Sequence, residues 1–437
     1  MSFTISGDEG GANLAAHTDL QQYAAEAESW LAASATPRQT ATPPAGRHPG
    51  TWGEDSDVVA IFHDLADHEE QAVLDRAMAW QVRKFDAGYG AIDWPTDVGG
   101  AGLTAHHLQV FEELETGYET PGHHETFSVT RHLVAPTLLA YGTPEQQRDL
   151  LPRFLRTTEL CCQLFSEPGA GSDLAGLSTR AERDGDSWIV TGQKTWSSGA
   201  RFAGWGELIC RTDLDAPKHA GQTAFVIPMD LPGITVVPIR QMSGGSSFNE
   251  VFFDGVRVPG SCRLGPIGEG WKVALTTLGF ERSTSGADRG GRAVGGSWAQ
   301  VRALAEHLGA TTEPVTRQHL AELYTLDRVR DFLALRSLAT IRSGGTPGPE
   351  ASIGKLLWTR WMTRVGDVTA AMLGPRLAAD SGEWGTYAWT EHLLGAPGYR
   401  IAGGSDEIQR NIIGERVLGL PGEPRVDRGI PFREVPR

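Results

Sequence analysis

The chain has 437 residues, a formal net charge of −15 and 40% hydrophobic residues. This length exceeds one ordinary core and predicts two or three packed units. The acidic balance argues against nucleic acid as a partner, and no apolar run approaches the roughly 18 residues of a membrane span. The N-terminus lacks the basic, apolar and small-residue order of a signal peptide, so we expect a cytoplasmic protein.

The first part of the chain has a helical pattern. Residues 1–17 are polar and glycine-rich, which predicts a disordered tail. Helical segments are expected at 20–31, 58–84, 108–116, 129–141 and 144–155. The last of these begins with a capping residue (Thr143), a proline in the first turn (Pro144) and a glutamine (Gln146). We assign 18–159 to an N-terminal helical domain.

The pattern changes after Glu159. Short runs rich in β-forming residues occur at 160–166, 187–196, 206–211, 223–229, 234–240 and 249–259. Helical patterns return at 268–307, 315–343, 350–378, 385–394 and 406–418. We therefore expect a middle β domain over 160–265 and a C-terminal helical domain over 266–437. Helices, a compact β unit and helices again, with no βαβ alternation, predict a mainly α fold with a central β domain (α+β).

Two segments of the β unit carry most of the functional information. Leu164–Asp173 reads LFSEPGAGSD, a strand that ends in a glycine-rich loop whose backbone amides suit a bulky anionic cofactor. The run from Trp188 to Trp196 turns back through Gly192 and brings an indole and two serines beside that loop. A planar aromatic side chain and small hydrogen-bonding residues next to an anion loop favour a flavin site.

Other chemically active residue types indicate structural roles. The four cysteines, in or near apolar strand-like runs, are expected to be buried free thiols: Cys161, Cys162, Cys210 and Cys262. The adjacent pairs His106–His107 and His123–His124 lack metal-ligand spacing, so we expect surface or capping roles and no metal site. The glycines of Gly286–Gly296 follow a helix rather than a strand, which argues against a dinucleotide loop.

Four motifs, in this order, resemble the acyl-CoA dehydrogenase family over about residues 55–421. They are FSEPGAGSD at Phe165–Asp173, GQKTW at Gly192–Trp196, FNEVFF at Phe248–Phe253 with VRVP at Val256–Pro259, and GSDEIQRNIIG at Gly404–Gly414. The resemblance implies an N-terminal helical domain, a middle β-barrel and a C-terminal four-helix bundle that mediates oligomerisation. It also implies an FAD-dependent α,β-dehydrogenation of an acyl-CoA (or acyl-carrier) thioester, with electrons passed to an electron-transfer flavoprotein. In detail the chain resembles an actinobacterial-type branch associated with sterol side-chain or other bulky acyl thioesters.

The resemblance assigns the cofactor contacts residue by residue. The positions implied for FAD binding are Gln163, Leu164, Phe165, Ser166, Gly171, Ser172, Trp196, Ser197, Ser198, Ser405 and Glu407. Of these, Trp196 would pack on the flavin ring, Ser198 would bond it near N5, and Ser172 would also meet the substrate on its CoA side. From the residues alone, Trp196 could instead be a core residue, the serines turn formers, and Ser405 only a helix cap.

Dehydrogenation beside a thioester needs a base for the α-proton and donors to the developing enolate oxygen. Much of the family has a glutamate as base in the last motif, where this chain has Gly403. The resemblance offers a second location on the helix after the β domain, and it implies that Glu281 is the catalytic base there. Arg282 would then lie in the acyl channel, and the Gly403 amide would hold the thioester oxygen.

Spacing supports a special environment for Glu281. Trp271, Ala274, Leu275 and Leu278 form an i, i+3, i+4, i+7 stripe, and Glu281 continues it. A carboxylate on an apolar stripe is costly unless it is paired or functional. From the residues alone, Glu281 could pair with an arginine such as Arg282, which could itself be an ordinary helix-surface cation.

Two segments through which family members bind the FAD of a neighbouring subunit have a different sequence in this chain. Ala305 and Leu308 stand where the family has an arginine and a phenylalanine, and Ala371–Leu377 replaces a glutamine- and glycine-rich segment. Losing a cation and an amide weakens the binding of an anionic cofactor unless other contacts compensate. Either a homologous chain supplies the missing FAD contacts in an α2β2 heterotetramer, or a homo-oligomer has compensating contacts to FAD. The alternative functions are a flavin oxidase or monooxygenase of the same fold, and a non-catalytic partner subunit.

Overall fold

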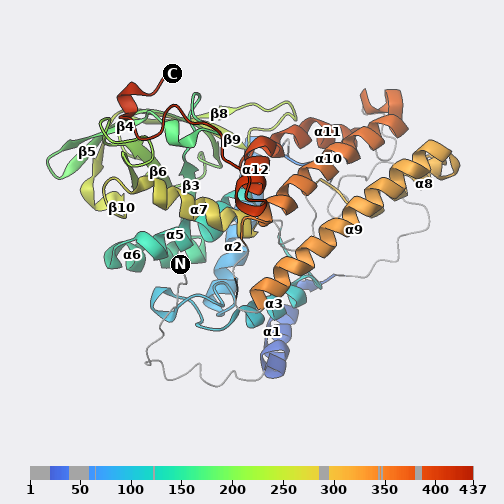
Figure 1. The fold of residues 1–437 in the computed structure, drawn as a ribbon. Coiled ribbons are helices and arrows are strands. Elements are labelled where there is room, and N and C mark those ends of the chain that lie inside the picture. Colours follow the sequence, from blue (N-terminus) through green and yellow to red (C-terminus); the bar gives the residue numbers. More distant parts are fainter. Residues whose placement is uncertain are drawn as a thin grey trace.

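The computed structural model describes residues 20–38, 59–63, 65–121, 124–284, 295–342, 345, 348–378 and 386–436. The predicted tail 1–17, His123 and most of Gly286–Gly296 lie outside these residues. In the described part, helices come first, strands follow and helices return, as Figure 1 shows. This order agrees with the expected α+β organisation.

The N-terminal part is helical, with one short pair of strands. Its elements are α1 (Leu20–Ser34), β1 (Thr36–Pro37), α2 (Asp67–Asp86), α3 (Ala105–Glu115), β2 (Tyr118–Glu119), α4 (Glu125–Ser128), α5 (Ala135–Tyr141) and α6 (Pro144–Arg156). Helix α6 begins as predicted, because Thr143 Oγ1 accepts from the Gln146 backbone amide and the Gln146 side chain accepts from the Thr143 amide. Helices α4 and α5 are joined by a π-helical turn over Val129–Val134, a feature often found beside functional sites.

The middle part is a sheet of eight strands. These are β3 (Cys161–Leu164), β4 (Arg180–Asp184), β5 (Ser187–Ser198), β6 (Trp205–Arg211), β7 (Gln222–Pro228), β8 (Ile234–Ile239), β9 (Phe248–Pro259) and β10 (Arg263–Leu264). Their order is β10-β7-β6-β4-β5-β9-β8, and β3 pairs in parallel with β6. A single residue pair, Arg180 with Arg211, joins β4 to β6.

The expected closed barrel is not confirmed. Strands β10 and β8 lie at the two ends of the sheet, and no pairing among the described strands connects them. Among the described strands, the Arg180–Arg211 pair is the only ladder pairing between the β3-β6-β7-β10 half and the β4-β5-β9-β8 half. Buried side chains from both halves fill the space between them, including Leu164, Trp188 and Phe225. The described strands therefore form an open sheet that encloses its own core.

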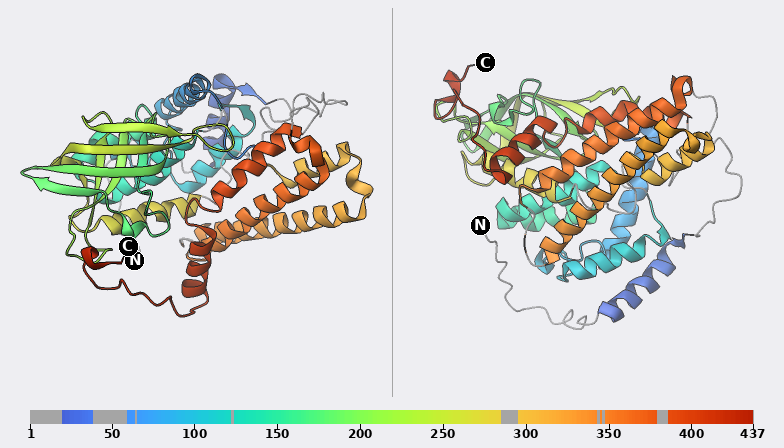
Figure 2. Two further views of the ribbon diagram at one scale, coloured as in Figure 1. Left: turned by 90° about the horizontal axis from the view of Figure 1, so that it is seen from above. Right: turned by 45° about the vertical axis from the view of Figure 1, so that its right-hand side comes forward.

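The C-terminal part is helical again. It contains α7 (Gly270–Thr284), α8 (Trp298–His307), α9 (Pro314–Arg342), α10 (Ala351–Leu373), α11 (Thr386–Tyr399) and α12 (Asp406–Ile412). Helix α7 packs against the sheet and α5, in one core with α6, whereas α8 to α11 share a separate core around Trp361 and Trp389. Helices α9, α10 and α11 run beside one another in both views of Figure 2. In the part of the chain that the structure describes, none of the helices has the length and apolarity that a membrane span needs.

The last residues return from the helices to the sheet. The chain leaves α12 and reaches the loop between β6 and β7, where Pro431 pairs with Pro217 (Figure 2). Phe432 is buried there, and the Arg211 guanidinium lies 3.8 Å from the centre of its ring. Lys218 pairs with Asp427 of this segment and with Asp173 of the glycine-rich loop. The C-terminal segment is thus fixed to the sheet by a buried ring and by ion pairs.

Candidate active site

The glycine-rich loop after β3 and the end of β5 are joined by a buried ion pair. Lys194, which is 0% exposed, donates from Nζ to Glu167 Oε1 at 2.9 Å and to the Phe165 carbonyl at 3.0 Å. The Thr195 backbone amide donates to the Ser166 carbonyl at 2.9 Å. These bonds hold the two sequence segments side by side, as the sequence predicted.

Glu167 is the main hydrogen-bond acceptor at this junction. Its carboxylate accepts from the Ser178 amide, the Ser178 hydroxyl and the Thr179 amide as well as from Lys194. Burial alone would raise the pKa of Glu167, but the Lys194 charge and the hydrogen bonds lower it to about 2. Glu167 is therefore a charged structural residue at neutral pH, and sequence reasoning did not assign it a role.

Trp196 protrudes from the end of β5. It has a φ of 60°, and the register of β5 against β9 shifts between Lys194 and Ser197. A left-handed backbone is unusual for a bulky residue and is found at functional sites. The indole is 58% exposed and meets the edge of Phe248 at 5.8 Å between ring centres. Its interpretation as a core residue is therefore wrong, and its exposure suits a stacking role.

The two serines after Trp196 have different surroundings. Ser197 is buried, and its carbonyl accepts from Asn249 Nδ2 at 3.0 Å. Ser198 is half-buried and donates from Oγ to Glu125 Oε1 at 3.3 Å. Glu125 as a whole residue is exposed, but neighbouring atoms remove its carboxyl from water, and this desolvation raises the pKa of Glu125. The nearby His124 and the hydrogen bond from Ser198 lower that pKa by smaller amounts. Glu125 was missed from the sequence, because no pattern links it to Ser198.

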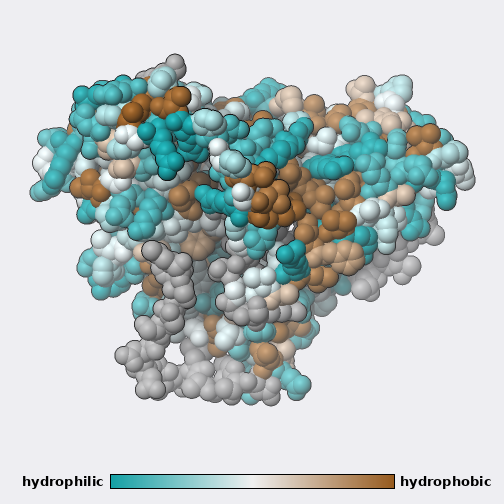
Figure 3. Space-filling model, in the orientation of Figure 1, coloured by the Kyte–Doolittle hydropathy of each residue, from teal (hydrophilic) through white to brown (hydrophobic). Residues whose placement is uncertain are grey.

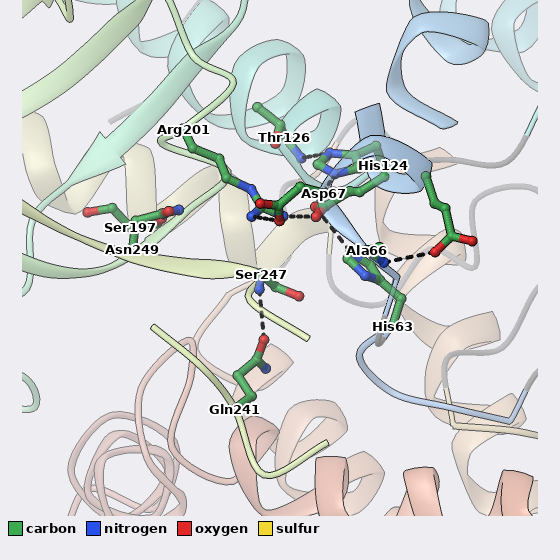
Figure 4. A network of polar contacts seen from close by, with 12 residues as sticks. His63, Ala66, Asp67, His124, Thr126, Ser197, Arg201, Gln241, Ser247 and Asn249 are labelled. Carbon is green, nitrogen blue, oxygen red and sulfur yellow. Dashed lines mark hydrogen bonds and ion pairs between the residues drawn. The ribbon is translucent and has the colours of Figure 1, made fainter. Parts of the chain in front are cut away.

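A cluster of charged residues fixes the turn after Ser198 (Figure 4). His63 Nε2 and His124 Nε2 lie 3.2 and 3.0 Å from Glu70 Oε1, and Arg201 pairs with Glu70 and Asp67. Burial raises the pKa of Glu70, but the two histidines and Arg201 outweigh it and hold the pKa well below the usual range. The cluster joins the start of α2 to the turn that carries the predicted flavin contacts.

The geometry of this cluster disfavours a metal ion, although its His63, Glu70 and His124 ligand atoms lie within 4.8 Å of one another. His124 Nδ1 accepts from the Thr126 backbone amide at 3.3 Å, so the proton of the neutral ring is on Nε2. A protonated ring nitrogen is no metal ligand, and the Arg201 guanidinium already neutralises Glu70. The predicted capping role holds for His124, and His107 likewise caps α3 by accepting from the Thr104 amide.

The remaining residues predicted on the glycine-rich loop divide into buried and open positions. The side chains of Leu164 and Phe165 are buried in two cores, which leaves only their backbone atoms available to a cofactor. Gln163 and Ser166 are half-buried, and Gly171 and Ser172 are exposed. All of these lie on the segment that the Lys194–Glu167 pair joins to β5. Their individual roles stay predictions.

The segment before α12 has its own fixed geometry. Gly403 has a φ of 63°, and its carbonyl accepts from Gln409 Nε2 at 2.9 Å. Ser405 Oγ accepts from the Ile408 amide at 3.3 Å, so Ser405 is a helix cap as the alternative interpretation held. Glu407 is exposed and pairs with Arg410. The reach of this segment towards a cofactor stays a prediction.

Glu281 and Arg282 lie in the last turn of α7, but their side chains are outside the described residues. The apolar stripe that led to Glu281 needs one correction, because Leu275 is 42% exposed. The buried face of α7 instead contains Val273, Ala274 and Thr277. Position 281 follows Thr277 by four residues, so it still lies on the continuation of the buried face.

The four cysteines are free thiols as predicted, but only three of them are buried. All four are free; Cys161, Cys162 and Cys210 are buried and Cys262 is partly exposed. Burial raises the pKa of each thiol, which keeps them neutral. We assign them to the core rather than to catalysis.

The residues at the junction fit a flavin. Three buried polar atoms there have no partner within the described residues: Gln163 Nε2, Ser197 Oγ and Asn249 Oδ1. Buried polar atoms are rarely left unpaired, so they indicate a missing ligand or water. Together with the exposed Trp196 indole and the open glycine-rich loop, they suit a planar ring with polar edges and an anionic tail. Fold and site define a flavoprotein.

Comparison with known proteins identifies the class of flavoprotein. The acyl-CoA dehydrogenase N-terminal, middle and C-terminal domain models match residues 60–158, 162–256 and 268–418. The chain is 39% identical to acyl-CoA dehydrogenase IpdE1 of Mycobacterium tuberculosis over 360 residues, 82% of this chain and 91% of that protein. The chain therefore belongs to the acyl-CoA dehydrogenase family, whose members are FAD-dependent oxidoreductases of lipid metabolism.

Two solved structures show the same fold. The steroid acyl-CoA dehydrogenase Tcur3481–Tcur3483 superposes with a TM-score of 0.69 at 27% identity, covering 94% of this chain and 100% of that chain. The ChsE4–ChsE5 complex from Mycobacterium tuberculosis superposes with a TM-score of 0.66 at 25% identity, covering 93% and 98%. Both are named as assemblies of two different chains.

Proposed function

We propose that this chain catalyses the α,β-dehydrogenation of a bulky acyl-CoA thioester, with Glu281 as the base that removes the α-proton. The observation that carries the proposal is the junction of the glycine-rich loop with Trp196, Ser197 and Ser198. The family's catalytic position in the last motif holds Gly403, which leaves Glu281 as the candidate on α7. FAD, when bound, supplies the acceptor for the hydride that leaves the β-carbon.

The chain's own residues have distinct tasks in this proposal. Trp196 packs on the flavin ring, and Gln163, Ser166 and Ser198 bond its polar edge. Gly171 and Ser172 leave the loop open for the anionic part of the cofactor or for CoA. The Gly403 amide holds the thioester oxygen, which stabilises the negative charge that develops when the α-proton leaves. Arg282 lies beside the base in the acyl channel.

The substrate and assembly proposals rest on the similar structures. A steroid acyl-CoA dehydrogenase is among them, which supports a sterol-derived or similarly bulky acyl group. Each of the two similar structures is named as two different chains, which supports an α2β2 heterotetramer of this chain with a homologous chain. Exposed apolar side chains gather over α9 and after α12 (Figure 3), including Phe332, Leu335 and Leu418. Such a surface suits contact with another subunit.

Replacement of the base tests the reaction. Glu281→Gln keeps the size and hydrogen bonding of the side chain but removes its basicity. We expect bound FAD with its normal absorbance and a loss of acyl-CoA turnover of 10²-fold or more, the order typical of a general base. Glu145→Gln, an exposed glutamate on α6, is the matched control and should keep full turnover. Equal activity of Glu281→Gln and the control would support a non-catalytic subunit instead.

The assembly and the electron acceptor need separate measurements. We expect the chain to bind FAD tightly only when it is co-expressed with a homologous chain, as measured by native mass and by FAD content. One tightly bound FAD per chain in a pure homodimer would contradict the heterotetramer. Transfer of electrons from the reduced enzyme to an electron-transfer flavoprotein is expected, whereas rapid reoxidation of the reduced enzyme by air would indicate the oxidase alternative.

A further inference from the structure

A buried carboxyl group on β6 contacts α7, the helix that carries the proposed base. Glu207, on β6, is 0% exposed, and its Oε1 accepts from the Thr277 hydroxyl on α7 at 2.7 Å. The other oxygen, Oε2, has no hydrogen-bond partner among the described residues. An ionised carboxylate with one unpaired oxygen in a core is unstable, whereas a neutral carboxylic acid is tolerated.

Glu207 connects to both halves of the proposed site. Thr277 precedes Glu281 by four residues on the same helix, which is one helical turn. On the other side, Glu207 is the register partner of Gln163 in the parallel β3–β6 pair. Gln163 is a predicted flavin contact, and its Nε2 is buried without a partner. Register partners in neighbouring strands present their side chains to the same face of the sheet.

The surroundings keep this carboxyl neutral. Burial raises the pKa of Glu207 to about 8, against a smaller opposite effect of the Thr277 hydrogen bond. Thr277 from α7 bonds Glu207 directly, and the Thr137 hydroxyl from α5 lies 3.0 Å from that of Thr277. Cys161 on β3 interacts electrostatically with Glu207. Cys161 is the titratable member, and burial raises the pKa of its thiol.

A neutral carboxylic acid has one proton to donate as well as an oxygen that accepts. Oε1 accepts from Thr277, so the proton resides on Oε2. Gln163, the register partner of Glu207, faces the same side of the sheet, but no hydrogen bond joins its amide to Oε2.

We propose that Glu207 is a positioning residue of the dehydrogenase site: as a neutral acid it holds Thr277, one turn before Glu281. The proposal rests on the proposed function for the role of Glu281. Ionisation of Glu207 places a buried negative charge beside α7. The helix that carries the base then loses a neutral buried support.

The protonation state of Glu207 can be measured directly. Infrared spectra of the FAD-loaded enzyme, in its native assembly, should contain a carbonyl band of a protonated carboxylic acid that fades as the pH rises through about 8. Glu207→Gln should lack this band. A wild-type enzyme with no such band above pH 6 would overturn the proposal, whatever its activity.

The functional consequence is read from the pH profile of kcat. Wild-type kcat should fall about tenfold from the neutral plateau to one pH unit above the pKa of Glu207, with KM little changed, because about one molecule in eleven keeps the proton there. In Glu207→Gln the ratio of the two kcat values should stay near one. An unchanged alkaline fall in Glu207→Gln would show that the carboxyl is only structural.

Two threonines of α7 provide a matched pair of variants. Thr277→Val removes the hydroxyl that reaches Glu207, so kcat should fall and the carboxylic-acid band should persist to higher pH. Thr276→Val removes a neighbouring hydroxyl that bonds Tyr141 and the Lys272 carbonyl instead, and it should change neither. Equal effects of the two variants would overturn the proposed link. If Glu281→Gln retains turnover, the proposed function fails, and the infrared titration still decides the state of Glu207.

Discussion

Replacement of Lys194 by methionine tests whether the buried ion pair organises the flavin site. The ammonium donates to Glu167 and to the Phe165 carbonyl, and Glu167 is only 6% exposed. In Lys194→Met, three donors remain for the carboxylate, but the opposite charge is gone. Breaking a buried pair in this way costs about 3–5 kcal/mol.

The pKa of Glu167 gives an independent magnitude. A carboxyl with a pKa of 4.5 in the unfolded chain and about 2 in the native state contributes about 3 kcal/mol at neutral pH. Because the native pKa is lowered, this contribution is present above pH 4.5 and is lost as the pH falls from 4.5 towards 2. We therefore expect a loss of about 3–5 kcal/mol in Lys194→Met at pH 7, of the same order as the whole contribution of Glu167.

Urea denaturation at pH 7 and at pH 3, together with FAD absorbance, measures the effect. Lys194→Met should unfold at lower urea and lose much less stability on acidification than the wild type. It should also release FAD more readily, because β5 and the glycine-rich loop are no longer joined. Asp86→Asn, which breaks an exposed pair with Arg156, is the control and should change little. The same midpoint for Lys194→Met and this control would refute the reasoning.

Three further changes probe other parts of the chain. Gly199→Ala forces a Cβ into the Thr126 hydroxyl at a φ of 61°, so we expect a loss of about 1–3 kcal/mol, measured by thermal unfolding, and weaker FAD binding. Wild-type stability should fall by up to about 5 kcal/mol between pH 4.5 and 8, because the raised pKa of Glu207 makes its contribution complete only below 4.5. Glu207→Gln should remove most of this fall in urea titrations. Phe432→Ala removes the ring under Arg211, which should cost about 3 kcal/mol and expose the C-terminal segment to proteases.

The local parts of the site were predictable from the sequence. The glycine-rich loop and the strand ending in Trp196 are identified by composition, and strand pairing then brings them together. The cap of α6 follows from Thr143 and Gln146, because a capping box depends only on residues within one turn. Signals of this kind need no knowledge of distant contacts.

The contacts between distant segments were not predictable. Glu125 meets Ser198 across 73 residues, and Glu207 meets Thr277 across 70. No periodicity encodes such pairs, since each depends on how complete elements dock. The same limit explains Leu275, whose spacing matched an apolar stripe although the docked face of α7 is centred on Val273 and Thr277. Closure of the β unit into a barrel came only from the resemblance, and the described strand pairs do not support it.

The replaced FAD-gripping segments have a structural explanation. Ala305 is fully buried in α8, and Leu308 packs against the core that contains Trp361. Leu377 also packs there, and its carbonyl accepts from the Thr390 hydroxyl. A cation at the fully buried position 305 would have to be removed from water, at a cost that FAD binding is not expected to recover. These positions therefore stabilise the helical part of this chain, and we expect the contacts to the anionic part of FAD to come from another element or from a partner chain.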